Sequence, residues 1–144
     1  MFRRLISTAA TWIPLPLRLA TGTIFVAHGA QKVLGSFNGP GFEKWISLPA
    51  PFNFMKPAWL WMAAAALSEL IGGILIFLGL LTRVGAFLIF CTMLTALVGK
   101  HWPSFFAPGG IEFTLALAAM CLALLISGGG MASVDLALSG GRRR

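Results

Sequence analysis

The chain has 144 residues, of which 58% are hydrophobic and only 10% are charged. Soluble domains carry about 25% charged residues, and so short a chain cannot hide this much apolar surface in one core. The composition therefore excludes an ordinary soluble protein. The net charge of +7 does not indicate nucleic-acid binding here, because basic residues in a membrane protein first report its orientation. At about 20 residues per helical span, the length predicts one membrane domain of four spans.

The N-terminal part of the chain starts with basic residues, as a signal peptide does, but Pro14, Pro16 and Arg18 interrupt the apolar stretch that a signal requires. We expect an uncleaved lead-in followed by a first span over roughly residues 15–34, with Pro16 in its first turn. Segment 36–57 is rich in Pro, Gly and Asn and is too broken to span. We predict a loop there, whose part 42–48 forms a short amphipathic helix anchored in the membrane interface by Trp45.

Three further spans are predicted at roughly 58–81, 84–99 and 111–126 by apolar runs of suitable length. Glu69 is the only charge in the first of these, and Thr82 and Arg83 form a tight turn after it. A glycine-rich segment at 128–130 ends the last span, and the remaining residues form a short tail that can lie on the membrane. The predicted fold class is all-α, a polytopic membrane protein with a four-helix bundle.

Orientation follows from the basic residues in the connections. In this arrangement six arginines fall on one side and three lysines on the other: Arg3, Arg4, Arg83, Arg142, Arg143 and Arg144 against Lys44, Lys56 and Lys100. Because cytoplasmic segments carry the basic excess, we expect a multi-pass protein of the inner (plasma) membrane with both termini in the cytoplasm. The 36–57 loop and the loop after residue 100 then lie outside.

Five ionisable side chains inside the predicted spans form the candidate site: Arg18, His28, Lys32, Glu69 and Glu112. Each charge near the bilayer centre costs about 2.5–3.5 kcal/mol on insertion scales, so these groups should face the bundle interior. At about 100° per residue, the three groups on the first helix share one face. Counting depth along the helices predicts a polar ladder in which His28 pairs with Glu69 and Lys32 pairs with Glu112.

Packing and capping offer an alternative explanation for some of these residues. Arg18 can extend to lipid phosphates, Glu112 can cap the fourth helix, and Lys32 is open to either interpretation. Glu69 is different, because a carboxyl near mid-bilayer needs a partner or a function as a protonated acid. Five glycines are predicted to be sites of close helix packing: Gly22, Gly29, Gly72, Gly73 and Gly79.

Two cysteines, Cys91 and Cys121, lie in apolar stretches without C-x-x-C or zinc-ligand spacing. We expect two core residues and no metal site, with a single buried disulfide between helices left open.

Three segments resemble the DoxX family of bacterial and archaeal membrane proteins: FVAHGAQKVLGSF, LSELIGGILIFLGLLTRVGA and FFAPGGIEFTLAL. They follow the family order, and the resemblance covers nearly the whole chain. The polar positions of the family match Arg18, His28, Gly29, Lys32, Glu69, Gly72, Gly73, Arg83, Gly110 and Glu112. The resemblance implies a four-helix inner-membrane protein associated with terminal quinol oxidase and thiosulfate:quinone oxidoreductase systems, and with redox assemblies that handle oxidative or sulfur stress.

The residues and the resemblance together favour a subunit of a membrane redox system. The sequence has no haem-ligand pattern and no glycine-rich nucleotide motif, so we expect no covalently bound cofactor and no redox centre of its own. A quinone or quinol headgroup is the expected ligand, in an outward-opening pocket between the first, second and fourth helices, with loops 39–41 and 108–110 at its mouth. His28 or Lys32 would donate hydrogen bonds, and Glu69 or Glu112 would relay protons.

Two alternatives remain at this point. One is a non-catalytic partner that anchors or assembles a larger complex, with protein subunits or further copies of this chain as partners, and whether the chain is an enzyme stays open. The other is a pathway for protons or small solutes, which four short spans without an inverted repeat disfavour.

Overall fold

The computed structural model describes residues 5–106 and 109–139 and contains four long helices. These are α2 (Pro14–Val33), α4 (Ala58–Leu78), α5 (Thr82–Ala96) and α6 (Ile111–Ser127). Shorter elements are η1 (Ser36–Asn38), α3 (Gly41–Ile46), the π-helical η2 (Leu97–His101) and α7 (Val134–Leu138). The described residues contain no strand, which confirms the all-α prediction. The long helices match the predicted spans to within three residues at each end, and a helix occurs at 41–46 inside the predicted loop.

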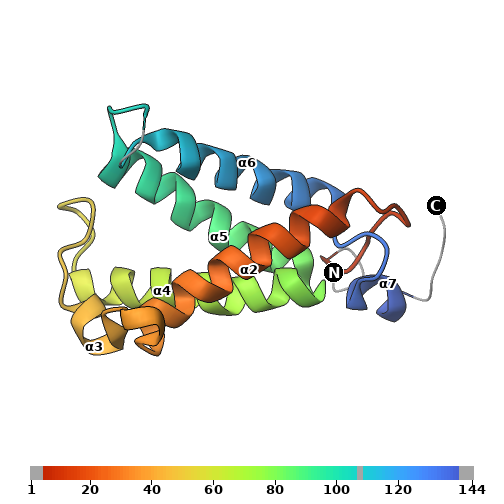
Figure 1. Cartoon of the computed structure of the whole chain (residues 1–144), viewed down its shortest axis with the longest axis horizontal. Helices are drawn as coiled ribbons and strands as arrows, with labels where there is room; N and C mark the ends of the chain where they lie inside the picture. The colour runs from red at the N-terminus through yellow and green to blue at the C-terminus, as the bar shows by residue number, and fades with distance from the viewer. Residues whose placement is uncertain (1–4, 107–108, 140–144) are drawn as a thin grey trace.

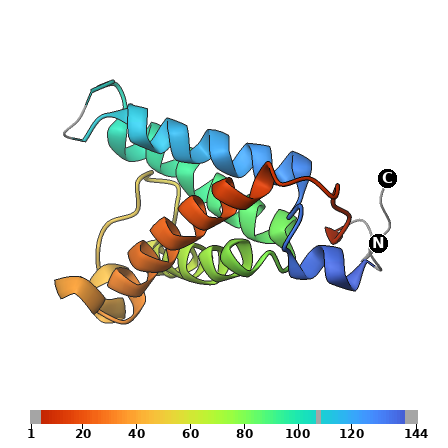
Figure 2. The same cartoon turned by 45° about the vertical axis from the view of Figure 1, so that its right-hand side comes forward.

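The helices form a bundle in which α2 packs along α4, α4 along α5, and α5 along α6. We refer to its two ends as the α3 end and the α7 end, after the short helices found there (Figure 1). α2 and α6 touch less than these three pairs. They approach each other near the α7 end and diverge toward the α3 end, as both views show (Figure 2).

Glycines set the distance between α2 and α4. A Cβ added at Gly22 would lie 2.8 Å from Phe77 Cα, and one at Gly29 would lie 2.5 Å from Leu70 Cα. From the other helix, a Cβ at Gly73 would lie 2.7 Å from the backbone nitrogen of Val26. Real side chains cannot occupy such positions, so the two backbones are in direct contact and their antiparallel register is specified. This confirms the prediction that these glycines serve close packing.

The connection between α4 and α5 lies slightly before the predicted turn. Gly79 (φ 68°) ends α4 with a left-handed residue, and Leu80 donates its N–H back to the Leu75 carbonyl, as in a helix-terminating glycine motif. Leu81 is also left-handed, and α5 begins at Thr82. Thr82 is therefore the first residue of a helix and not the centre of a turn.

The core lies between α2, α4, α5 and α6 and includes Phe25, Ile76, Ile89 and Leu124. Cys121 is buried in this core, as predicted, whereas Cys91 is exposed on α5, so its prediction as a core residue is wrong. Both thiols are free.

Two helical stretches, Ala58–Leu78 and Thr82–His101, are long and apolar enough to cross a bilayer. In the most apolar 18 residues of each stretch, only 33% and 28% of the residues are buried, respectively. Most apolar side chains there therefore point outward. This is the reverse of a core helix in a soluble protein and suits a helix that faces lipid. α2 has 20 residues but is the least apolar of the four long helices, and α6 is apolar but has 17 residues.

Candidate functional site

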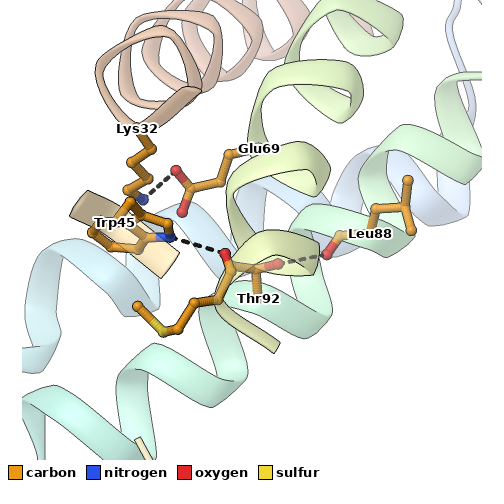
Figure 3. A network of polar contacts seen from close by, with 6 residues as sticks. Lys32, Trp45, Glu69, Leu88 and Thr92 are labelled. Carbon is orange, nitrogen blue, oxygen red and sulfur yellow. Dashed lines mark hydrogen bonds and ion pairs between the residues drawn. The ribbon is translucent and has the colours of Figure 1, made fainter. Parts of the chain in front are cut away.

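Lys32 and Glu69 form an ion pair that joins α2 to α4. Figure 3 shows the Lys32 ammonium pointing at the Glu69 carboxylate. The Glu69 side chain is 4% exposed and the Lys32 side chain 16%, so the carboxylate is enclosed while the ammonium keeps limited access. The structure thus brings together two of the five predicted residues.

This arrangement corrects both predicted rungs of the ladder, because the partner of Glu69 is Lys32 and not His28. Helical side chains lean toward the N-terminus of their own helix. α2 and α4 are antiparallel, so the long Lys32 side chain leans toward the α7 end and Glu69 leans toward the α3 end. These two groups converge. His28 lies one turn closer to the α7 end and leans away from Glu69.

Trp45 covers the ion pair from the α3 end. The Lys32 Nζ lies 4.6 Å from the centre of the Trp45 ring, which is cation–π distance. The indole Nε1 donates a 2.9 Å hydrogen bond to the Met62 carbonyl and so fixes α3 on α4 (Figure 3). Trp45 was predicted to anchor α3 in the membrane interface. Its half-buried ring forms one wall of the Lys32–Glu69 site, and its anchoring in the interface stays a prediction.

The remaining residues of the predicted ladder lie elsewhere. The imidazole of His28 is exposed on α2 and forms no hydrogen bond with any described residue. Glu112 is half-buried in the first turn of α6, where a carboxylate is favoured by the helix dipole. One residue of the predicted pocket mouth, Pro108, lies outside the described residues.

A groove of about 560 Å³ opens between α2, η1 and α4. Its wall is mostly apolar and contains none of the residues predicted to line a headgroup pocket. The residues that line the groove are Thr23, Val26, Ala27, Ala30, Ser36, Phe37, Ile74, Phe77 and Leu78. At about 100° per residue, Ala30 on the groove wall and Lys32 point to nearly opposite sides of α2. The groove is therefore separate from the Lys32–Glu69 site.

Arg18 occupies the opposite end of the bundle and is only 2% exposed. Its guanidinium donates to the Ile76 and Phe77 carbonyls at 3.0 Å each, which are among the last carbonyls of α4. It also donates to the Gly129 carbonyl at 3.0 Å and the Ala132 carbonyl at 3.2 Å, in the segment after α6. The explanation that Arg18 extends to lipid phosphates is therefore wrong. Five guanidinium N–H groups suit a cluster of carbonyls at a helix C-terminus.

Asp135 is a structural residue that the sequence analysis missed. It is 1% exposed, and its carboxylate accepts hydrogen bonds from Leu81 N (2.7 Å), Thr82 N (2.9 Å) and Thr82 Oγ1 (2.7 Å). It thereby caps the N-terminus of α5, where a negative charge is favoured. The sequence contains a signal for this role, because Asp135 is one of only four acidic residues in the chain and lies in an apolar run.

The segment containing Asp135 packs into the α7 end, so residues up to 139 do not form the free tail that was predicted. The rest of that tail, residues 140–144, lies outside the described residues. Ser133 caps α7 by accepting a hydrogen bond from Leu136 N, and the Asp135 N–H donates to the Gly79 carbonyl. Nearby, Arg83 donates to the Leu125 and Ile126 carbonyls at 2.7 and 2.8 Å and closes the end of α6. We call Arg18, Asp135 and their partners the helix-end clamp.

The two polar clusters differ in what they offer a ligand. In the helix-end clamp the guanidinium and the carboxylate are occupied by backbone groups and the Thr82 hydroxyl. In the Lys32–Glu69 site a cation with three donors and a carboxylate that can hold a proton face each other in an apolar surrounding. Within residues 5–106 and 109–139, no group of three or more His, Cys, Asp or Glu residues is placed to hold a metal ion.

Comparison with known proteins agrees with this architecture. The sequence profile of the DoxX family matches residues 13–102. The chain is 34% identical over 121 residues to a protein of Bacillus subtilis (strain 168) described as "Putative oxidoreductase CatD", a match that covers 84% of this chain and 83% of that protein. No solved structure matches the chain significantly. The chain belongs to the DoxX family of membrane-associated proteins.

Proposed function

We propose that the protein is an inner-membrane subunit of a redox system that binds a quinone or quinol headgroup at the Lys32–Glu69 site. The observation that carries this proposal is the enclosed ion pair beneath the Trp45 ring. The name of the Bacillus subtilis relative supports a role beside an oxidoreductase. The resemblance to a family associated with quinone-linked enzymes points in the same direction.

The residues of the site fit the chemistry of a headgroup. A quinone becomes a quinol by taking up two electrons and two protons, one proton on each carbonyl oxygen. Lys32 donates a hydrogen bond to a carbonyl oxygen, and Glu69 carries a proton to or from the same region. Trp45 supplies an aromatic face for the ring. The electrons pass between the quinone and a partner oxidoreductase, while this chain binds the headgroup and moves protons.

Binding of a soluble quinone analogue to the protein in lipid nanodiscs tests this proposal. Wild type should bind, and Lys32→Met and Glu69→Gln should each weaken binding by about tenfold, the equivalent of one lost hydrogen bond of about 1.4 kcal/mol to a charged group. Lys44→Met on exposed α3 is the matched control and should bind as wild type does. Absence of binding, or equal binding by all four proteins, would favour the alternative of a non-catalytic assembly partner.

We also propose that all four long helices cross the membrane, with both termini in the cytoplasm and the α3 end outside. α4 and the α5–η2 stretch support this by length and composition, and α2 and α6 pack beside them. The distribution of basic residues supplies the orientation. Reporter fusions after Gly140 should read cytoplasmic, and fusions at Asn53 external. The reverse result would mean that the α3 end and the Lys32–Glu69 site lie on the cytoplasmic side of the membrane.

A further inference from the structure

We infer that the ligand of the Lys32–Glu69 site arrives sideways from the lipid, along the side of α2 that carries His28. The site then selects lipid-soluble quinones with a hydrocarbon tail over charged, water-soluble ones. This inference rests on the proposed function and adds the class of substrate and its route.

His28 is the first observation. It lies well inside α2, is exposed, and forms no hydrogen bond with the described part of the chain. In a bilayer an exposed side chain at this depth faces hydrocarbon, where an unpaired polar group costs several kcal/mol. An imidazole in that position needs a polar partner from outside this chain, and a headgroup arriving from the lipid supplies one.

The side of α2 that carries His28 is not covered by α6 along its outer half. Thr21 lies on nearly the same stripe, two turns earlier, and its hydroxyl bonds to the Met120 sulfur on α6 at 3.9 Å. Beyond that contact α2 and α6 diverge toward the α3 end (Figures 1 and 2). His28 therefore stands on the stripe that faces α6 at a level where α6 has moved away.

Approach from water is obstructed at the α3 end. Trp45 lies over Lys32 and is held by its hydrogen bond to the Met62 carbonyl. Further along the loop, Pro51 and Phe52 pack closely on Gly99 of η2. A Cβ added at Gly99 would lie 2.6 Å from the Pro51 side chain. The segment before α4 is thus tied down on both α4 and η2.

The spacing of His28 and Lys32 suits one headgroup. The two residues are four apart on α2, which places them about 6 Å apart along the helix and about 40° apart around it. This matches a ring that carries one carbonyl oxygen on each of two opposite sides. His28 is then the donor for the oxygen nearer mid-membrane, and Lys32 is the donor for the other.

The test compares two quinones with the same ring, one with a decyl tail and one with a sulfonate, on the protein in nanodiscs. His28→Ala removes the proposed donor, and His28→Trp fills the route. Ala27→Trp is the matched control, because it adds the same bulk one residue away and points into the groove between α2 and α4. Thermal unfolding verifies that each variant is folded.

We expect the tailed quinone to bind wild type and Ala27→Trp equally, His28→Ala about tenfold more weakly, and His28→Trp more weakly still. The sulfonated quinone should bind wild type at least tenfold more weakly than the tailed one. The inference is overturned if the sulfonated quinone binds as tightly as the tailed one, or if the His28 variants bind the tailed quinone as Ala27→Trp does. Failure of both quinones to bind wild type would instead overturn the proposed function.

Discussion

The two ends of the bundle use charged residues in opposite ways. At the α7 end, Arg18 donates to carbonyls from α4 and from the segment after α6, and Asp135 accepts three hydrogen bonds from the start of α5. Near the α3 end, Lys32 and Glu69 bind each other, and His28 one turn away has no partner among the described residues.

This contrast separates structural charges from candidate functional ones. A charged group that forms its hydrogen bonds with backbone groups holds helix ends together and has few donors or acceptors left for a ligand. An ion pair can open toward a ligand, because each member offers the same chemistry to a headgroup as to its partner. The insertion cost alone does not distinguish these cases, since all five ladder residues are costly in a bilayer.

The strongest test of the contrast removes Arg18. Arg18→Met should lower the free energy of unfolding by about 3–5 kcal/mol, because it leaves several buried carbonyls unpaired and Asp135 without its nearby cation. Arg83→Met is the control, since Arg83 also binds carbonyls at a helix end but is half-exposed, and it should cost about 1 kcal/mol. Denaturant unfolding in detergent measures both. Equal losses would mean that burial does not distinguish the two arginines.

A second test replaces one carboxylate at each end by its amide. Asp135→Asn should cost about 2–3 kcal/mol, because the amide NH₂ would face the N–H and O–H donors of Leu81 and Thr82. Glu69→Gln should cost about 1 kcal/mol, since Lys32 can still donate to the amide oxygen, but it should weaken quinone binding. Thermal unfolding and binding are measured on the same samples. The contrast fails if Asp135→Asn weakens binding while leaving stability unchanged.

A third test, with a smaller expected effect than Arg18→Met or Asp135→Asn, substitutes glycines along the α2–α4 contact. Gly22→Ala and Gly29→Ala should each cost about 1–2 kcal/mol, because the added Cβ would overlap the α4 backbone and push the helices apart. Only Gly29→Ala should also weaken quinone binding, since it lies one turn from Lys32. Equal binding by the two variants would show that the ion pair tolerates a shift of α2.

The sequence could predict the helices because their signals are local. Apolar runs, prolines and glycines define where each long helix begins and ends, and agreement to within three residues follows from these signals. The close-packing glycines were also predictable, because small residues in apolar helices mark sites where backbones meet. Selecting Lys32 and Glu69 required only the cost of a charge in an apolar stretch.

The sequence could not predict how these side chains pair. Counting residues placed His28 level with Glu69, and the depth was nearly right, but depth does not state where a side chain points. The choice of Lys32 depended on the lean of side chains in antiparallel helices and on the register set by the α2–α4 glycines. The role of Asp135 depended on a contact with residues more than fifty positions earlier.

By itself, the sequence determined an all-helical, strongly apolar chain with four long helices and a few costly charges. The tertiary structure alone decided that Arg18 and Asp135 join helix ends, that Trp45 covers Lys32, and that His28 faces outward. The physical reason is the range of the interactions. Helix formation and apolar periodicity act over a few neighbouring residues, whereas each polar pairing depends on which helix faces are brought together by packing.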